Sequence, residues 1–92
     1  MKLRVVWGRR AANDVDAIAE FIAKDSKRAA NKVVRYIRKS AVLLKDSPRL
    51  GRPSLEGKRE LILSRYPYVL VYRIENSEVR ILAVFHQSQD RP

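Results

Sequence analysis

His86 is the residue of this sequence best suited to acid–base chemistry, because it is the one histidine and it follows the apolar run 79–85 directly. A general base needs a substrate and an orienting partner within hydrogen-bonding distance. The three residues after His86 are two glutamines and a serine, which are neither strong acids nor strong bases. We therefore interpret His86 as the end of the last strand, bonded to the backbone or to the Arg52–Arg59 region. Catalysis and contact with a partner are the alternatives.

Arginines near the predicted strands are the second group with useful chemistry, since a guanidinium binds phosphates and carboxylates. Together with the histidine, the candidates for contact with a target are Arg52, Arg59, Arg65, Arg73, His86 and Arg91. Arg73 either pairs with a carboxylate such as Glu60 or Glu75 or presents its charge to the target.

The sequence contains no motif for a metal site, a disulfide or a bound cofactor. The chain has no cysteine, one histidine and scattered carboxylates, and its three glycines are too far apart for a phosphate-binding loop. We expect no metal site and no cofactor. No apolar stretch reaches the roughly 18 residues of a membrane span, so we expect a cytoplasmic protein that does not enter the membrane.

Charge is the unusual property of the chain. Twenty Lys and Arg against ten Asp and Glu give a net charge of +10. Such a chain is expected to seek an anionic partner, which is an acidic protein, a nucleic acid or an anionic membrane. We expect no membrane partner, and direct nucleic-acid binding is not favoured.

These side chains must be positioned by a single domain, residues 1–92. Residues 2–7 alternate in polarity and predict a strand, and apolar spacings of three and four predict a helix over about 10–24. Ser26 is placed to cap a second helix that runs to about Lys45. Two prolines and two glycines, Pro48, Gly51, Pro53 and Gly57, predict a loop from Asp46 to about Lys58.

The second predicted helix carries a basic stripe opposite its apolar arc. The stripe consists of Arg28, Lys32, Arg35 and Lys39. There is no acidic residue between Ser26 and Lys45, although opposite charges four residues apart would stabilise the helix. A solvated helix face is one interpretation of the stripe, and a binding surface for an acidic partner is the other.

Three strands are predicted over 59–65, 68–74 and 79–86, with short joins that make them antiparallel neighbours. Both faces of the middle strand are largely apolar, which predicts layers on each side of it. The order β-α-α-β-β-β predicts an α+β fold in which a helical hairpin packs on a small, mostly antiparallel sheet. The pattern leaves open whether the first strand joins an edge or inserts beside a later strand.

The ordered set of motifs resembles the RelE/ParE superfamily of bacterial type II toxins over nearly the whole chain. The motifs are Val5-Val6-Trp7, the block 14–23, Ala29-Ala30, Gly51-Arg52-Pro53, Arg59-Glu60-Leu61, Tyr66-Pro67-Tyr68, Val71-Tyr72-Arg73 and His86. The nuclease branch commonly has an arginine just before the Leu-Val-Tyr of the central strand, where this chain has Val69. The chain is therefore more similar to the ParE branch.

The resemblance implies a non-enzymatic toxin that binds DNA gyrase and is neutralised by a cognate acidic antitoxin, ParD-like or similar, encoded nearby. It implies that the basic stripe meets the antitoxin. A RelE-like, ribosome-dependent mRNA endonuclease and an inert relative are the alternatives. The tail keeps His86 and Pro92 of the ParE pattern but has Gln89 where arginine is usual, and Asp90 or Arg91 where an aromatic residue is usual.

Overall fold

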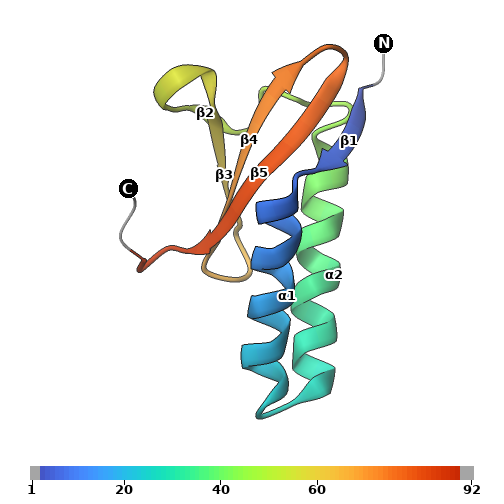
Figure 1. Cartoon of the computed structure of the whole chain (residues 1–92), viewed down its shortest axis with the longest axis vertical. Coiled ribbons are helices and arrows are strands. Elements are labelled where there is room, and N and C mark those ends of the chain that lie inside the picture. The colour runs from blue at the N-terminus through green and yellow to red at the C-terminus, as the bar shows by residue number, and fades with distance from the viewer. Residues whose placement is uncertain (1–2, 90–92) are drawn as a thin grey trace.

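The computed structural model describes residues 3–89, which form two helices and a five-stranded sheet (Figure 1). The elements are β1 (Arg4–Trp7), α1 (Arg9–Ala23), α2 (Lys27–Leu43), β2 (Arg52–Pro53), the 3-10 turn η1 (Leu55–Gly57), β3 (Arg59–Ile62), β4 (Tyr68–Glu75) and β5 (Glu78–His86). The strand order is β1-β5-β4-β3-β2, with β1 parallel to β5 and the other neighbours antiparallel. This confirms the predicted α+β architecture, and it places the first strand at an edge.

The two helices form a hairpin whose apolar stripes face the sheet. The Ser26 side chain accepts a hydrogen bond of 3.1 Å from the Ala29 amide, so it caps α2 as predicted. The predicted apolar arc of α2 is the part that enters the core, with Ile37, Ala41 and Leu44 fully buried. No helix within residues 3–89 is long and apolar enough to cross a membrane.

A two-residue turn joins β4 to β5. Asn76 and Ser77 have φ angles of 50° and 62°, the left-handed values that a type I′ hairpin turn requires at both central positions. The turn matches the twist of the two strands and fixes their register from Glu75 opposite Glu78 as far as Tyr72 opposite Ile81.

A β-bulge at Leu82 changes which β5 side chains face the helices. Tyr72 is opposite Ile81, whereas the preceding residue, Val71, is opposite Ala83, so Leu82 is the extra residue of β5. Before the bulge Ile81 faces the helices. After it Val84 joins the core, and Ala83 turns to the other face.

Two predicted boundaries were wrong. The strand predicted over 59–65 ends at Ile62, because the chain turns before β4 and Tyr36 of α2 bonds to this turn: its hydroxyl lies 3.0 Å from Ser64 Oγ and accepts a 3.2 Å bond from the Arg65 amide. The loop predicted from Asp46 to about Lys58 contains β2 and η1, since β2 pairs with β3 in antiparallel register.

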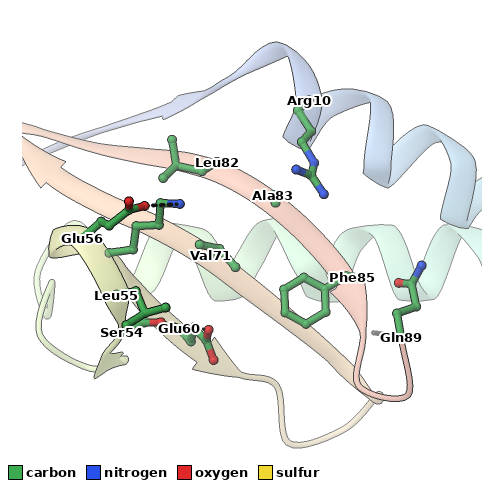
Figure 2. Close-up of a pocket in the computed structure, with 11 residues that line it drawn as sticks. Arg10, Ser54, Leu55, Glu56, Glu60, Val71, Leu82, Ala83, Phe85 and Gln89 are labelled. Atoms are coloured by element: carbon green, nitrogen blue, oxygen red, sulfur yellow. Dashed lines mark hydrogen bonds and ion pairs between the residues drawn. The ribbon is translucent and has the colours of Figure 1, made fainter. Parts of the chain in front are cut away.

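The helices cover one face of the sheet, and the main core lies between them. This core joins α1 and α2 to the side chains of Leu70, Tyr72, Val79 and Ile81. The second covering layer predicted for the middle strand was wrong: the opposite face carries an open groove (Figure 2). Val69 is nevertheless fully buried on that face by its neighbours within the sheet.

Candidate functional site

The groove on the helix-free face of the sheet has a volume of about 420 Å³. Its floor is apolar and comes from two neighbouring strands, with Val71 on β4 and Leu82, Ala83 and Phe85 on β5. The bulge creates this floor, because strict alternation would have turned Ala83 and Phe85 toward the helices. Leu55 of η1 forms one wall and is 79% exposed, which is high for a large apolar side chain.

Charged side chains border this floor on both sides. Figure 2 shows Arg10 of α1 and Gln89 on one side, and the η1 residues with Glu60 on the other. Glu60 is 8% exposed, and its carboxylate accepts a 3.1 Å bond from Ser54 Oγ and lies 3.5 Å from an Arg52 guanidinium nitrogen. A buried carboxylate is tolerated where hydrogen bonds and an opposite charge compensate its lost hydration.

Arg59 stabilises the loop that leads to the groove. Its guanidinium donates a 2.7 Å bond to the Gly51 carbonyl. The buried Tyr72 hydroxyl donates to the Pro48 carbonyl at 2.6 Å and accepts from the Gly51 amide at 2.9 Å. A Cβ at position 51 would lie 2.7 Å from that hydroxyl, so the loop can pass here only with glycine. Burial raises the pKa of the Tyr72 hydroxyl, which stays protonated as a donor.

Among residues 3–89, the partner of Arg73 is a backbone carbonyl and not a carboxylate. Its guanidinium donates a 3.1 Å bond to the carbonyl of Glu56, a residue with a φ of 56° at the tip of η1. The sequence predicted pairing with Glu60 or Glu75, or charge presented to a target. The carboxylate prediction was wrong, because η1 folds back over this face and brings a carbonyl to Arg73.

Arg65 lies at the opposite end of the sheet, in the turn between β3 and β4. Its side chain is exposed, and its backbone amide bonds to Tyr36 as described above. The hydrogen bond with the Ser64 side chain is the main reason that the pKa of Tyr36 is lowered. Tyr66 adds an edge-on ring contact with Tyr36 at 5.3 Å between centroids. These contacts hold the turn against α2 and leave the Arg65 guanidinium toward solvent.

His86 lies outside the groove lining, at the end of β5. Its Nδ1 accepts a 3.1 Å bond from the Ser88 amide and lies 2.7 Å from Ser88 Oγ. Because a backbone N–H can only donate, Nδ1 acts as an acceptor. The ring packs edge-on against Tyr68 at 5.4 Å. Within residues 3–89 no carboxylate bonds to this ring, and the predicted bond to the backbone is confirmed.

The basic stripe of α2 is solvent-exposed along its whole length. Arg28, Lys32, Arg35 and Lys39 are all exposed, and none of them takes part in an ion pair with another residue in the described range 3–89. We call these four residues the α2 ridge.

A second hollow, of about 440 Å³, lies where β1 meets the two helices. Trp7 and Val15 supply apolar walls, and Val42 beside them is 54% exposed. Asp16 of α1 and Arg38 of α2 line the same hollow.

The structure divides the predicted target-binding set. Arg52, Arg59 and Arg73 lie around β2, η1 and the end of β4, whereas Arg65 and His86 lie at the far end of the sheet. Arg91 is outside the described residues.

None of the predicted target-binding residues that fall within residues 3–89 lines the groove. The cationic residues that do line it, Arg10 and Lys58, were missed. Arg10 was missed because it precedes the apolar stripe of its helix. The groove was missed because the bulge that creates its floor has no local sequence signal. Among the described residues no cluster of potential ligands could hold a metal ion.

Comparison with known proteins now decides the family. Residues 5–91 match the family described as "ParE toxin of type II toxin-antitoxin system, parDE". The chain belongs to the ParE toxin family. This ParE-family chain is 39% identical to the putative toxin Y4kP of Sinorhizobium fredii, over 97% of its own length and 93% of the relative's. It is 31% identical to toxin RelE2 of Caulobacter vibrioides, over 94% and 97% of the two chains.

Solved structures agree with the ParE fold. A chain of the chromosomal ParDE toxin–antitoxin system of P. aeruginosa superposes with a TM-score of 0.83 at 30% identity, covering 92% of this chain and 96% of the other. A chain of the toxin–antitoxin complex RelBE2 of Mycobacterium tuberculosis superposes with a TM-score of 0.59 at 26% identity, covering 94% of this chain and 99% of the other. The ParE-family chain is thus a type II toxin of the RelE/ParE superfamily, as its motifs predicted.

Proposed function

We propose that this ParE-family toxin acts by binding DNA gyrase, that it makes no covalent change in its target, and that a cognate acidic antitoxin neutralises it. The observation that carries this proposal is the chemistry of the groove. Its floor is apolar, its cations lie at the rim, and the histidine of the chain is not part of its lining. Such a surface suits an apolar anchor with acidic neighbours better than a scissile phosphate.

Val69 supports the same choice. A nuclease must stabilise negative charge on the phosphate with preorganised cations or donors. At the position where the nuclease branch commonly carries an arginine, this chain has a valine that is fully buried. Neither the residue type nor its burial provides such a group.

Target binding is proposed to centre on Leu55, Phe85, Arg10 and Lys58 of the groove. Arg52 contributes from the adjoining strand, because its side chain is 59% exposed in spite of the Glu60 contact. Arg59 and Arg73 contribute indirectly, since each already bonds to backbone carbonyls that shape the loop. Arg65 and His86 remain peripheral contacts in this proposal.

The antitoxin is proposed to be drawn in by the α2 ridge and to dock on apolar surface elsewhere. Exposed charge accelerates association with an oppositely charged partner, and salt screens this effect beyond about 8–10 Å. Reversing the four ridge charges is therefore expected to slow antitoxin association at low salt without changing the fold. An unchanged association rate would show that the ridge is only a solvated helix face.

A ribosome-dependent nuclease is the second candidate, and the resemblance to a relative named RelE2 favours it. A paired experiment separates the two: supercoiling by purified gyrase, and in vitro translation with mapping of mRNA ends. We expect the chain to inhibit supercoiling and to leave mRNA intact. Cuts in the ribosomal A site that His86→Gln abolishes would overturn the proposal.

A further inference from the structure

The α2 ridge has the geometry of a linear array of cations. Its members follow one another at spacings of four, three and four residues along one side of a helix that is unbroken from Lys27 to Leu43. At a rise of about 1.5 Å per residue, the first and last Cα atoms are about 16 Å apart. In Figure 1 the lower part of the helical hairpin, with the start of α2, extends beyond the strands, and all four ridge residues are exposed.

The charges on this array are not neutralised within the described structure. The ion pairs of residues 3–89 use Arg4, Arg10, Arg52, Lys58 and Arg80, all of them on or beside the sheet and none on α2. The neighbouring helix α1 exposes Asp16 and Glu20, but neither pairs with the ridge within 4.0 Å. Like charges one helical turn apart cost a few tenths of a kcal/mol per pair. The arrangement is thus mildly unfavourable in the free chain.

The ridge also has no apolar centre. From Lys27 to Lys39 every exposed residue of α2 is basic, apart from Asn31. The exposed apolar residues of this helix, Val42 and Leu43, follow only after the ridge has ended. Protein-docking surfaces contain a desolvated apolar or aromatic core, whereas contacts to a nucleic-acid backbone consist of cations and hydrogen-bond donors.

We propose that the α2 ridge binds the phosphodiester backbone of a double-stranded nucleic acid without reading its sequence. A B-form duplex carries one negative charge per about 1.7 Å of helix axis over its two strands, so several phosphates lie within the length of the ridge. The acidic α1 beside it would be repelled by the duplex, which orients the helix pair with α2 toward the backbone. This contact goes beyond the proposed function, because steering an antitoxin needs no contact at the ridge.

The test is fluorescence anisotropy with three probes: a 20-base-pair DNA duplex, an RNA duplex of the same sequence and poly-L-glutamate. A protein that neutralises Z phosphates gives a slope of about −0.9Z when log K is plotted against log salt. Reversing all four ridge charges to glutamate should therefore make the slope shallower by about 3 to 4. At 100 mM salt the affinity for a duplex should fall by roughly two orders of magnitude.

A matched variant carries the same net charge with the ridge intact. It reverses four basic residues outside the ridge: Arg9→Glu, Lys24→Glu, Lys45→Glu and Arg49→Glu. Each set lowers the formal charge from +10 to +2. We expect the matched variant to keep the wild-type slope to within about one. Circular dichroism checks both folds, and glutamine at the four ridge positions replaces glutamate if the reversal variant does not fold.

Two results would overturn the proposal. Equal loss of duplex binding in both variants would assign binding to net charge rather than to the ridge. Ridge-dependent binding of poly-L-glutamate as tight as that of the duplexes would assign the ridge to an acidic protein. Binding of DNA and RNA duplexes alike is expected for backbone contact, and a preference for one of them identifies the source of the phosphates. Because no gyrase is present, this outcome is independent of the proposed function.

Discussion

Replacing Tyr72 by phenylalanine should destabilise the fold more than the loss of one oxygen atom suggests. The Tyr72 side chain is fully buried, and its hydroxyl bonds to the Pro48 carbonyl at 2.6 Å and to the Gly51 amide at 2.9 Å. Phenylalanine keeps the ring but removes both bonds. The Gly51 amide would then lose its partner in a buried place, and the Pro48 carbonyl would lose its partner in a partly buried one.

The expected magnitude follows from these two groups. A buried donor or acceptor that loses its partner costs about 1–3 kcal/mol, partly offset because a buried hydroxyl is removed as well. We expect a loss of about 2–3 kcal/mol in the free energy of unfolding. With a urea m-value of about 1 kcal/mol per M for so small a domain, the midpoint of unfolding should fall by about 2–3 M.

Tyr36→Phe is the matched control in the same urea titration. The Tyr36 hydroxyl also makes two bonds, to Ser64 and to the Arg65 amide, but both are exposed to solvent. Water can replace the hydroxyl there, so the cost should stay below about 1 kcal/mol. Equal losses in the two variants, or a loss below about 1 kcal/mol for Tyr72→Phe, would refute the reasoning.

The remaining predictions concern pH, the groove, the histidine and the antitoxin. Burial raises the pKa of the Tyr72 hydroxyl, so its contribution to stability is complete below the unfolded pKa of about 10 and is lost as pH rises through the higher folded pKa. Between pH 9 and 11 the wild type should therefore lose more free energy of unfolding than Tyr72→Phe. Parallel curves of unfolding free energy against pH for the two proteins would contradict this. Leu55→Glu should abolish gyrase inhibition with no loss of melting temperature, whereas Leu50→Glu, exposed to 53% but outside the groove, should leave inhibition intact. His86→Gln should lower the free energy of unfolding, measured in urea, by about 1 kcal/mol and keep growth arrest in cells, because only the local bonds to Ser88 change and no proton transfer is lost. Loss of growth arrest with the fold intact would show instead that His86 is catalytic. The product of the neighbouring gene, at a hundredfold excess over its Kd, should stabilise the chain by about 2.7 kcal/mol, and an unchanged melting temperature would exclude it as the antitoxin.

The two helices and the N-cap of α2 could be predicted from the sequence because their signals are local. Apolar spacings of three and four placed both helices to within two residues at each end, and Ser26 was recognised as a cap. The helical periodicity of 3.6 residues also predicted the basic stripe and its exposure, since the residues opposite a buried arc must face solvent.

The groove could not be predicted because its causes are not local. One extra residue at Leu82 shifts the alternation of β5, and strict period-two reading of that strand gives the wrong face for Ala83 and Phe85. The partners of Arg59 and Arg73 are backbone carbonyls of the segment 49–56, whose path depends on Gly51 passing over Tyr72. For Arg73 the sequence left open a carboxylate partner and a charge presented to the target, and it did not indicate a backbone carbonyl.

Inhibition of purified gyrase tests the central claim most directly. Relaxed plasmid is incubated with ATP, a fixed amount of gyrase and increasing amounts of the chain, and the supercoiled fraction is measured on a gel. The proposed function predicts that supercoiling falls to a plateau, that Leu55→Glu fails to lower it, and that prior addition of the antitoxin restores it. Full supercoiling at every concentration of a chain that still arrests growth in cells would contradict gyrase as the target.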